Sequence, residues 1–487
     1  MRIKIFFLDL CTIFVFVLSG CNNGEVEEAA GTLDPTIADT EKINKFIIEG
    51  VGTYYLWESE TDWSLYDDSK TFAAYSDHKK LFERFIYKDD YWSLLTENID
   101  DLENQFEGIS TTFGYTLKFY YHPFTGNNEV IAIVLYTTPG SPAASAGLKR
   151  GDIIVGMNGG KITDLNYQDL YLASSLVLQC GVLDTEAGSI SPVPGVKNMA
   201  AVRMYENPVN TSKIIEKAGR RVGYLCYTGY QIESEPELVR VFSDFKSAGV
   251  TDVVLDLRYN PGGYSRTALI LSSLLAPEHA VKGKKVYLEH YYNDLYTAYL
   301  KENGRELSET FIDTLPESAC MNLERLYVLT GKNTASASEA TMVGLEPYLN
   351  VIQIGDTTSG KYCGGILLSP ESLYGEKNKN YYATFSNWGM YIMIYRYANV
   401  KGITSFTGGL VPAENMLAAE NVFDLKPFGD ETDPLLGRAL AHILGENYVE
   451  KRSGKILQPL IPLPDKKRPI DGMLIAEPSF PVRVDPK

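Results

Sequence analysis

The chain has 487 residues, 45% of them apolar and 22% charged, which is typical of a globular protein with about two to four domains. Lys and Arg number 45 against 62 Asp and Glu, and the resulting net charge of −17 argues against nucleic acid as a partner. Five His and six Cys, without a CxxC or HExxH motif, argue against a zinc or iron–sulfur enzyme. We therefore expect no metal and no cofactor.

Residues 1–20 have the pattern of a signal peptide. Basic Arg2 and Lys4 precede an apolar stretch, 5–18, that is too short for a comfortable membrane span. The ending Leu18-Ser19-Gly20-Cys21 resembles the lipobox of bacterial lipoproteins, which implies that Cys21 is acylated; a plain signal peptide with an incidental Cys is the alternative. Residues 21–38, with their acidic and small side chains, are expected to form a tether. The expected location is the bacterial cell envelope, outside the cytoplasm.

Four cysteines remain once Cys11 is assigned to the signal peptide and Cys21 to the lipid: Cys180, Cys226, Cys320 and Cys363. An oxidising compartment permits disulfides, but the wide spacings predict no particular pairing. Free buried thiols are the preferred interpretation.

Residues 39–105 are predicted to be a helical N-terminal domain. Ile43, Phe46, Ile47 and Val51 recur at helical spacing and form one apolar stripe. Further helical stretches are predicted at 78–86 and 91–106. The many aromatic residues here are interpreted as core, and a docking or dimerising role for the domain is a hypothesis.

Residues 106–190 change to short β-like runs. A strand is predicted at 129–136, then a short helix opened by Ser141 with Pro142 at its first position and stopped by Gly147. A second strand, 153–157, is followed by a turn at Asn158-Gly159-Gly160.

This order, with the phrase GSPAASAGLKRGDIIVGMNG, resembles a PDZ domain of the bacterial protease type. The resemblance implies that an extended peptide is bound by strand addition and that its C-terminal carboxylate is held by backbone N–H groups. It places the carboxylate loop near Gly108, Ile109 and Ser110. A PDZ-shaped spacer that binds nothing is the alternative.

A linker is predicted at 187–195 (AGSISPVPG), and residues 196–450 then follow an α/β rhythm. Strand 221–227, a helix opened by a capping box at Ser234 and Glu237, and strand 253–257 predict a right-handed crossover between parallel strands. The rhythm returns at 326–354. Residues 451–487 hold seven of the 23 prolines and are interpreted as an extended tail without a core of its own.

Three motifs in this α/β region carry the chemistry. Ser336-Ala337-Ser338-Glu339 stands at a strand-to-helix junction, where unpaired N–H groups suit a developing oxyanion. Ser336 or Ser338 could instead merely cap the helix. Lys361 follows 25 residues later, and a helix of about 12 residues with a returning strand of about five would bring it back beside Ser336.

The third motif, Asp256-Leu257-Arg258-Tyr259-Asn260-Pro261-Gly262-Gly263, lies at the C-terminal end of a predicted parallel strand, where open α/β sheets bind ligands. Its paired glycines permit an exposed N–H group. A tight turn without further function is the alternative for this motif alone.

Together the three motifs resemble those of the C-terminal processing peptidases, also called tail-specific proteases, over about residues 106–444. The resemblance implies that Ser336 is the nucleophile and Lys361 the general base, its pKa lowered by burial. It also implies that the backbone N–H of Ala337 and of Gly262 or Gly263 form the oxyanion hole, with Ser338 and Glu339 structural. Many members carry a Gln four residues after the lysine, where this chain has Gly365.

The predicted fold is therefore multidomain α+β: the helical domain, a β-sandwich or barrel-like PDZ domain and a crotonase-like α/β protease core. The predicted function is an envelope-anchored serine endopeptidase that recognises protein C-terminal tails and cleaves through an acyl-enzyme. A catalytically weak PDZ adaptor that binds peptides is the alternative. Expected partners are proteins or peptides with accessible C-termini, and the membrane through the lipid anchor only; a homo-oligomer is left open.

Overall fold

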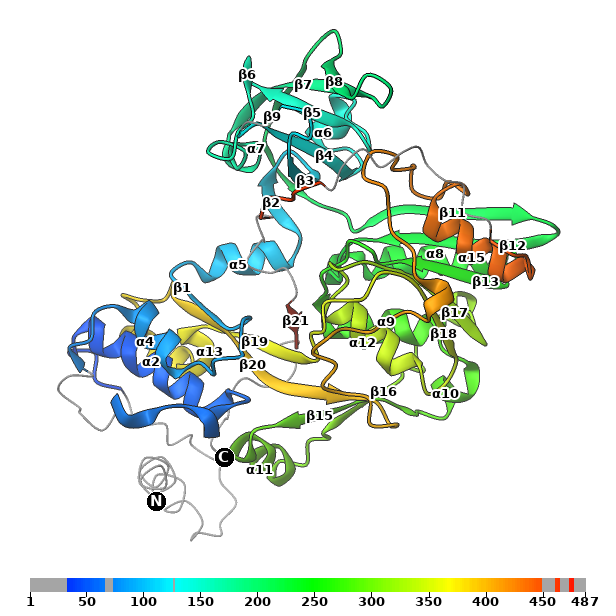
Figure 1. The fold of residues 1–487 in the computed structure, drawn as a ribbon. Coiled ribbons are helices and arrows are strands. Elements are labelled where there is room, and N and C mark those ends of the chain that lie inside the picture. Colours follow the sequence, from blue (N-terminus) through cyan, green and yellow to red (C-terminus); the bar gives the residue numbers. More distant parts are fainter. Residues whose placement is uncertain (1–32, 66–72, 126–127, 449–459, 465–472, 477–487) are drawn as a thin grey trace. The chain divides into compact units, whose positions relative to one another are not determined.

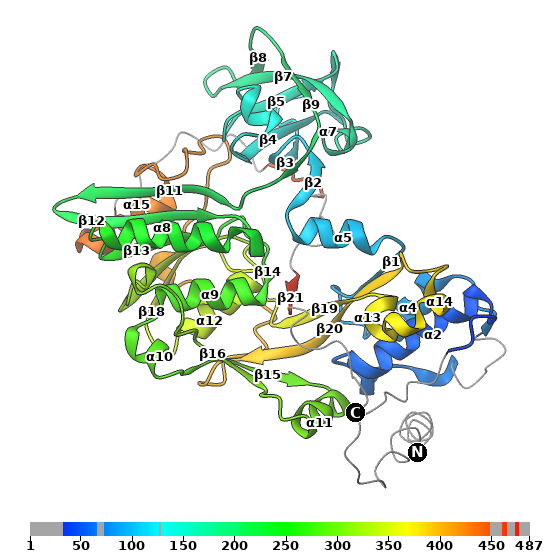
Figure 2. The same ribbon diagram turned by 180° about the vertical axis from the view of Figure 1, so that it is seen from behind.

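The computed structural model describes residues 33–65, 73–125, 128–448, 460–464 and 473–476. The predicted signal peptide, Cys21 and the tether up to residue 32 lie outside these ranges. The chain divides into two compact units, the first drawn from Met1–Ile99, Ile366–Ile392 and Ala476–Lys487, the second from Asp100–Gly365 and Met393–Ile475 (Figures 1 and 2). No helix within the described ranges combines the length and apolarity that a membrane crossing needs.

The first unit is helical, as predicted, but is not built from one continuous segment. The predicted apolar stripe of α2 is buried, and Phe46 packs against Tyr374 and Phe385 with ring centroids 6.4 and 6.3 Å away. The helical prediction for 91–98 is wrong, because β1 pairs there with the first residues of β20. The elements of this unit are α2 (Asp39–Tyr54), η1 (Glu58–Glu60), η2 (Trp63–Leu65), α4 (His78–Phe85), β1 (Leu94–Thr96), α13 (Pro370–Tyr374), η5 (Glu376–Asn378) and α14 (Lys379–Tyr382).

The second unit begins with α5 (Ile99–Phe106) and a seven-stranded antiparallel sheet in the order β3-β4-β5-β7-β8, with β6 on β5 and β9 on β7. Strand β3 therefore lies at an edge. Ser141 caps the predicted short helix α6 by accepting the N–H of Ala144 at 3.2 Å. The strands and helices of this region are β2 (Ile109–Thr112), β3 (Tyr115–Tyr121), β4 (Val130–Thr137), α6 (Pro142–Ser145), β5 (Ile153–Met157), β6 (Gly160–Lys161), α7 (Asp169–Leu172), β7 (Ser175–Asp184), β8 (Ser189–Pro192), β9 (Lys197–Ala200) and β10 (Val202–Tyr205).

The predicted linker at 187–195 is instead part of this sheet. Strand β8 pairs with β7, from Asp184 opposite Ser189 to Gly181 opposite Pro192. Because β8 is the outermost strand, Pro192 removes no hydrogen bond from a central ladder, and proline is tolerated at such an edge. The sheet continues to Ala200, beyond the predicted boundary at residue 190.

The core that follows is layered α/β. Its five-stranded sheet has the order β11-β12-β13-β17-β18, and all its pairs except the β11–β12 hairpin are parallel, as the crossover pattern predicted. Helix α15 packs on one face against Tyr224, Val254 and Leu329, while Phe245 of α8 covers Gly223 on the other. The bounds are β11 (Val209–Lys217), β12 (Arg220–Tyr227), α8 (Glu235–Ser247), β13 (Asp252–Asp256), β17 (Arg325–Thr330), α12 (Ala337–Leu345), β18 (Asn350–Gly355) and α15 (Pro434–Leu444).

A second sheet of the core holds β14 (Gly263–Tyr264), β21 (Leu474–Ile475), β19 (Cys363–Leu368), β20 (Gly389–Ala398), β15 (Val286–Tyr292) and β16 (Ser308–Thr310), in that order. The presence of β21 corrects the interpretation of the C-terminal tail, because this tail segment supplies a buried strand. The remaining elements are η3 (Ile232–Ser234), α9 (Ser265–Leu275), α10 (Glu278–Lys282), α11 (Asp294–Glu302), η4 (Glu317–Ala319) and η6 (Glu414–Met416).

The start of α8 differs from the predicted capping box. Ser234 lies at the N-cap position, but its hydroxyl donates to the carbonyl of Gln231 at 2.6 Å within the preceding 3₁₀ turn. The predicted stripe of this helix, which includes Leu238 and Phe242, is buried, and Gly249 follows the helix with a φ of 71°.

The four cysteines of the described chain are free thiols; Cys180, Cys226 and Cys363 are buried and Cys320 is half-buried.

Candidate active site

Ser336 has an unusual backbone conformation at the junction between β17 and α12. Its φ of 61° and ψ of −112° lie outside the ordinary regions for a residue with a side chain, which costs on the order of 1–3 kcal/mol. The side chain is fully buried, and among the described atoms its Oγ has no hydrogen-bond partner. Ser336 is also the N-cap residue of α12, where Glu339 three residues on accepts its backbone N–H in a capping box.

The carboxylate of Glu339 joins the Ser336 and Lys361 segments. Its Oε2 accepts the N–H of Ser336 at 2.8 Å and the N–H of Lys361 at 2.9 Å. Its Oε1 accepts the N–H of Gly360 at 2.6 Å and the hydroxyl of Thr358 at 2.5 Å. Burial raises the pKa of Glu339 to about 7, and these four hydrogen bonds oppose that rise. We call Glu339 and its four donors the carboxylate clamp.

Tyr397 of β20 holds the same two residues from their carbonyl side. Its hydroxyl lies 2.9 Å from the carbonyl oxygen of Lys361 and 3.3 Å from that of Ser336. Burial raises the pKa of Tyr397 well above its ordinary value, so the phenol keeps the proton that it donates. The backbones of Ser336 and Lys361 are thus fixed through both their N–H and their C=O groups.

Lys361 itself is fully buried, in the turn between β18 and β19. Four residues later, Gly365 lies where many C-terminal processing peptidases have Gln, and it pairs with Ile475 of β21. The neighbouring Gly364 leaves room for the ring of Tyr395, whose hydroxyl would lie 2.5 Å from a Cβ at that position.

The motif 256–263 meets the Ser336 segment through Asn260. The carbonyl of Asn260 accepts the N–H of Ala335 and the hydroxyl of Ser338, both at 3.1 Å. A short distance away, the hydroxyl of Thr334 donates to the carbonyl of Leu257 at 2.7 Å. The structure therefore brings the three sequence motifs together, and Ser338 serves as a link between two of them.

Gly262 is a glycine because Ser336 lies against it. A Cβ at Gly262 would lie 2.7 Å from Ser336 Cβ and 3.1 Å from the nitrogen of Ala337, the first residue of α12. The N–H of Gly262 donates to Asn260 Oδ1 at 2.9 Å, and the N–H of Gly263 donates to the carbonyl of Met473 at 3.0 Å. Of the predicted oxyanion donors, Ala337 follows Ser336 directly and Gly262 lies against it, while both glycine N–H groups are engaged within the chain.

Arg258 anchors the same motif in a buried charge network. Its guanidinium contacts Asp256, Glu420 and Asp433, at 2.8, 2.6 and 2.8 Å. Burial alone would lower the pKa of Arg258, but the three carboxylates hold it well above its ordinary value. Arg150, from the loop before β5, adds a second cation by pairing with Glu420. These charges fix the chain immediately before the paired glycines.

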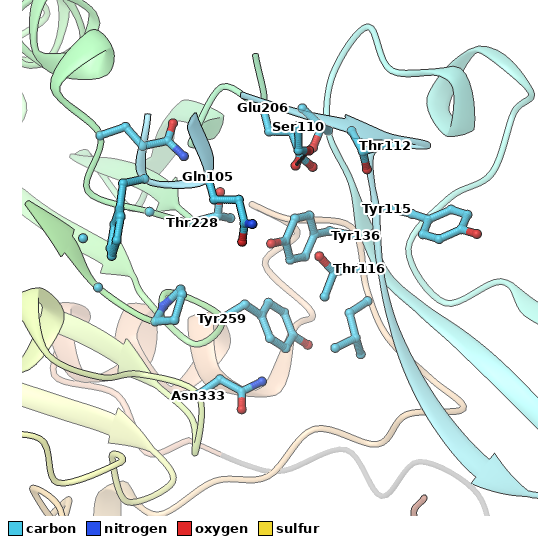
Figure 3. A pocket seen from close by; sticks show the side chains of 18 of the residues that line it. Gln105, Ser110, Thr112, Tyr115, Thr116, Tyr136, Glu206, Thr228, Tyr259 and Asn333 are labelled. Carbon is cyan, nitrogen blue, oxygen red and sulfur yellow. Dashed lines mark hydrogen bonds between the residues drawn. The ribbon is translucent and has the colours of Figure 1, made fainter. Parts of the chain in front are cut away.

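A cavity of about 540 Å³ opens beside the glycines and is lined by both the β3-containing sheet and the core. Figure 3 shows Tyr136, Tyr259, Thr116 and Asn333 along it. The rings of Tyr136 and Tyr259 lie 5.8 Å apart. Gly262 and Gly263 are also among its lining residues, so the cavity reaches the 256–263 motif.

The residues predicted as the PDZ carboxylate loop occupy a different element. Ile109 and Ser110 lie in strand β2, paired with β10, and line the cavity. The hydroxyl of Ser110 donates to the carboxylate of Glu206 at 2.8 Å. Gly108 precedes the strand with a φ of 74°, as the backbone turns out of α5. The turn before edge strand β3 is instead formed by Phe113 and Gly114.

Two residues that contribute to the site, Tyr397 and Met473, lie outside the sequence motifs. Tyr397 lies 36 residues beyond Lys361 in an apolar strand, where nothing in the pattern distinguishes it from its neighbours. Met473 lies in a segment whose prolines suggested an isolated tail. The pattern of the tail did offer one signal, the short uncharged run at 473–476 within charged surroundings.

Among the described residues no group of three His, Cys, Asp or Glu side chains is placed to hold a metal ion.

Comparison with known proteins agrees with the chemistry of this site. Residues 221–405 match Peptidase family S41. The match spans all of Ser336, Lys361 and the 256–263 motif. A crystal structure from Bacteroides fragilis NCTC 9343, assigned to the S41 proteases, is 26% identical with a TM-score of 0.66 and covers 82% of this chain and 97% of its own.

Two relatives from Bacillus subtilis (strain 168) are named carboxy-terminal processing proteases. CtpA is 27% identical over 231 residues, 47% of this chain and 44% of the relative. CtpB is 25% identical over 268 residues, 54% of this chain and 48% of the relative. The chain thus spans about half the length of the curated relatives it matches. The chain is thus similar to S41 peptidases and to carboxy-terminal processing proteases over part of their length.

Proposed function

We propose that this chain is an envelope-anchored serine endopeptidase in which Ser336 is the nucleophile and Lys361 the general base. One observation carries the proposal: a single carboxylate oxygen of Glu339 accepts the backbone N–H groups of both residues, at 2.8 and 2.9 Å. Strain and an unpaired buried hydroxyl at Ser336 support it, because both are costly unless the residue has a function.

In the proposed reaction Ser336 Oγ bonds to the carbonyl carbon of the substrate while its proton passes to Lys361 Nζ. The oxyanion is stabilised by the N–H of Ala337 and of Gly262 or Gly263. The substrate C–N bond then breaks, and the leaving amine takes the proton from Lys361. Water hydrolyses the resulting ester with Lys361 again as base, which restores Ser336. Complete burial is the environment in which a lysine can act as a base.

The test compares Ser336→Ala and Lys361→Ala with matched variants in the full chain. Both are expected to lose cleavage of fluorescein-labelled casein, and Ser336→Ala to lose labelling by a fluorophosphonate probe. Lys332→Ala removes a lysine from the same region whose side chain is 83% exposed, and Ser338→Ala removes a neighbouring hydroxyl; both are expected to remain labelled. Normal casein turnover by the Ser336→Ala protein would refute the proposal.

Recognition of protein C-terminal tails by the PDZ-like sheet is part of the proposal. Its support is edge strand β3, since an edge strand is what peptide addition requires. A peptide-binding adaptor is the second candidate, favoured by Gly365, which brings no side chain to orient Lys361. Tail peptides that bind a chain whose Ser336 never reacts with the fluorophosphonate would favour the adaptor.

Lipid anchoring is proposed from the sequence Leu18-Ser19-Gly20-Cys21. Cells fed an alkyne fatty acid are expected to label the wild-type chain and not the Cys21→Ala variant. Equal labelling of the two proteins would refute the anchor.

A further inference from the structure

The C-terminal part of the chain contributes a strand directly beside Ser336. Residues 473–476 are at most 3% exposed, and β21 lies between β14 and β19, parallel to both (Figure 2). Leu474 pairs with Gly263, while Ile475 pairs with Tyr264 on one side and Gly365 on the other. The segment Met-Leu-Ile-Ala is uncharged and aliphatic.

The carbonyl of Met473 occupies the place where a substrate carbonyl is expected. It accepts the N–H of Gly263, which is a predicted oxyanion donor, at 3.0 Å. The same oxygen lies 3.0 Å from the position of a Gly262 Cβ, a point only 2.7 Å from Ser336 Cβ. Hydrogen bonds to a peptide carbonyl next to a buried, strained serine are the contacts that a bound peptide would make.

A second tail segment, 460–464, adds to the edge of the PDZ-like sheet. Tyr121 donates its N–H to the carbonyl of Ile461 at 3.0 Å, and Leu463 donates its N–H to the carbonyl of Phe119 at 3.1 Å. The segment is antiparallel to β3, with Pro462 opposite Tyr120. Leu463 is buried in the core of the sheet. This is the strand-addition mode by which PDZ domains bind peptides.

We propose that the tail is an intramolecular peptide ligand of this enzyme. Residues 473–476 occupy the peptide site beside Ser336, residues 460–464 occupy the strand-addition edge of β3, and both must leave before another peptide binds. The occupant also defines the substrate class: extended, uncharged, aliphatic segments. The inference rests on the proposed function, because it assigns an occupant to the proposed catalytic site.

The principal test releases the tail by placing a charge in its buried strand. Ile475→Asp puts a carboxylate at a position that is 2% exposed, whereas the matched Leu165→Asp puts one at a position outside the tail that is 93% exposed. We expect Ile475→Asp to react with the fluorophosphonate, and to cleave casein, at least about tenfold faster than wild type. The apparent affinity of a site scales with the fraction of molecules in which the site is open, so release of the tail raises it. Leu165→Asp should behave as wild type.

A second measurement covers the case in which Ile475→Asp unfolds, which its thermal melting curve reveals. The milder Ile475→Ala variant then replaces Ile475→Asp, and the capped tetrapeptide acetyl-Met-Leu-Ile-Ala-amide is added to it. The peptide is expected to slow fluorophosphonate labelling of Ile475→Ala competitively, and acetyl-Met-Leu-Asp-Ala-amide is expected to leave it unchanged.

The outcomes separate this inference from the proposed function. If neither wild type nor any tail variant reacts at Ser336, the proposed function fails. If wild type reacts at Ser336 but a folded Ile475→Asp or Ile475→Ala reacts no faster than wild type, or does not react, the strand is structural and the inference is overturned. A wild-type chain that ends at Met473, while Ser336→Ala keeps residues 474–476, would mean that the occupant is cleaved as a substrate, and this supports the inference.

Discussion

Replacing Glu339 by Gln is expected to lower activity in a protein that still folds. Glu339→Gln keeps the size of the side chain but changes one acceptor oxygen into an NH2 donor. Each carboxylate oxygen accepts two hydrogen bonds, so either orientation of the amide leaves two buried donors of the carboxylate clamp without an acceptor. At about 1–3 kcal/mol each, the loss is about 2–6 kcal/mol.

Removing the buried carboxylate offsets part of that loss. The pKa of Glu339 is raised from 4.5 to about 7 by burial, so the stability that the protonated group contributes is fully present below pH 4.5 and disappears as pH rises through 7. At pH 8 the ionised form costs on the order of 3 kcal/mol, which the Gln variant avoids. The difference in unfolding free energy between the two proteins should therefore shrink by about 3 kcal/mol between pH 4.5 and pH 8.

The loss of catalytic rate in Glu339→Gln is not offset in this way. Without the clamp the backbones of Ser336 and Lys361 can shift, and a displacement of about 1 Å costs roughly 10²-fold in rate. We expect kcat/KM on labelled casein at pH 8 to fall between about tenfold and a hundredfold, while urea denaturation shows a folded protein. Glu346→Gln, at the other end of α12 and paired with Lys401, is the control and should stay within about twofold. Wild-type kcat/KM in Glu339→Gln would refute the positioning role.

Three further predictions concern the surrounding structure. Arg258→Ala leaves the buried carboxylates of Asp256 and Asp433 without their cation and should cost about 3–5 kcal/mol in urea denaturation, against less than about 1 kcal/mol for the exposed Arg240→Ala; equal losses would contradict the network. Burial lowers the pKa of His290 from 6.5 to about 3, so its contribution is present above pH 6.5 and is lost as pH falls. At pH 4.5 the loss is about 3 kcal/mol, which His290→Phe should abolish, and parallel stability–pH curves for the two proteins would count against this. Gly262→Ala should abolish fluorophosphonate labelling because its Cβ meets Ser336, whereas Gly304→Ala, with open space around it, should be labelled normally; retained labelling of Gly262→Ala would show that the site tolerates the methyl group.

Much of the core followed from local pattern. The parallel strands β12, β13, β17 and β18 are buried apolar runs separated by helical stripes, which is the form that periodicity detects best. The meeting of Ser336 and Lys361 could be predicted because a helix and a returning strand of known rise connect them. Those predictions depended on residues close in sequence.

The features that sequence did not predict depend on distant pairing. The helical pattern at 91–98 yields to β1 because Gly389 and Met390 provide a partner strand about 300 residues later. The tail strand is buried only because Gly263 and Gly365 leave an open edge on each side. Ser234 is a local exception. Its hydroxyl donates to the carbonyl of Gln231 and does not cap α8, and composition does not reveal which of these two local hydrogen bonds forms.

The discontinuous first unit has a consequence for synthesis. The chain emerges from the ribosome N-terminus first, so α2 exists long before Tyr374, Phe385 and strand β20, which cover its apolar stripe. Until the chain has been synthesised as far as residue 392, the apolar stripe of α2 remains uncovered and is prone to self-association. Fragments that end earlier, or that begin after β1, therefore lack half of a shared core, and the shortest independently folding piece of this unit must contain both segments.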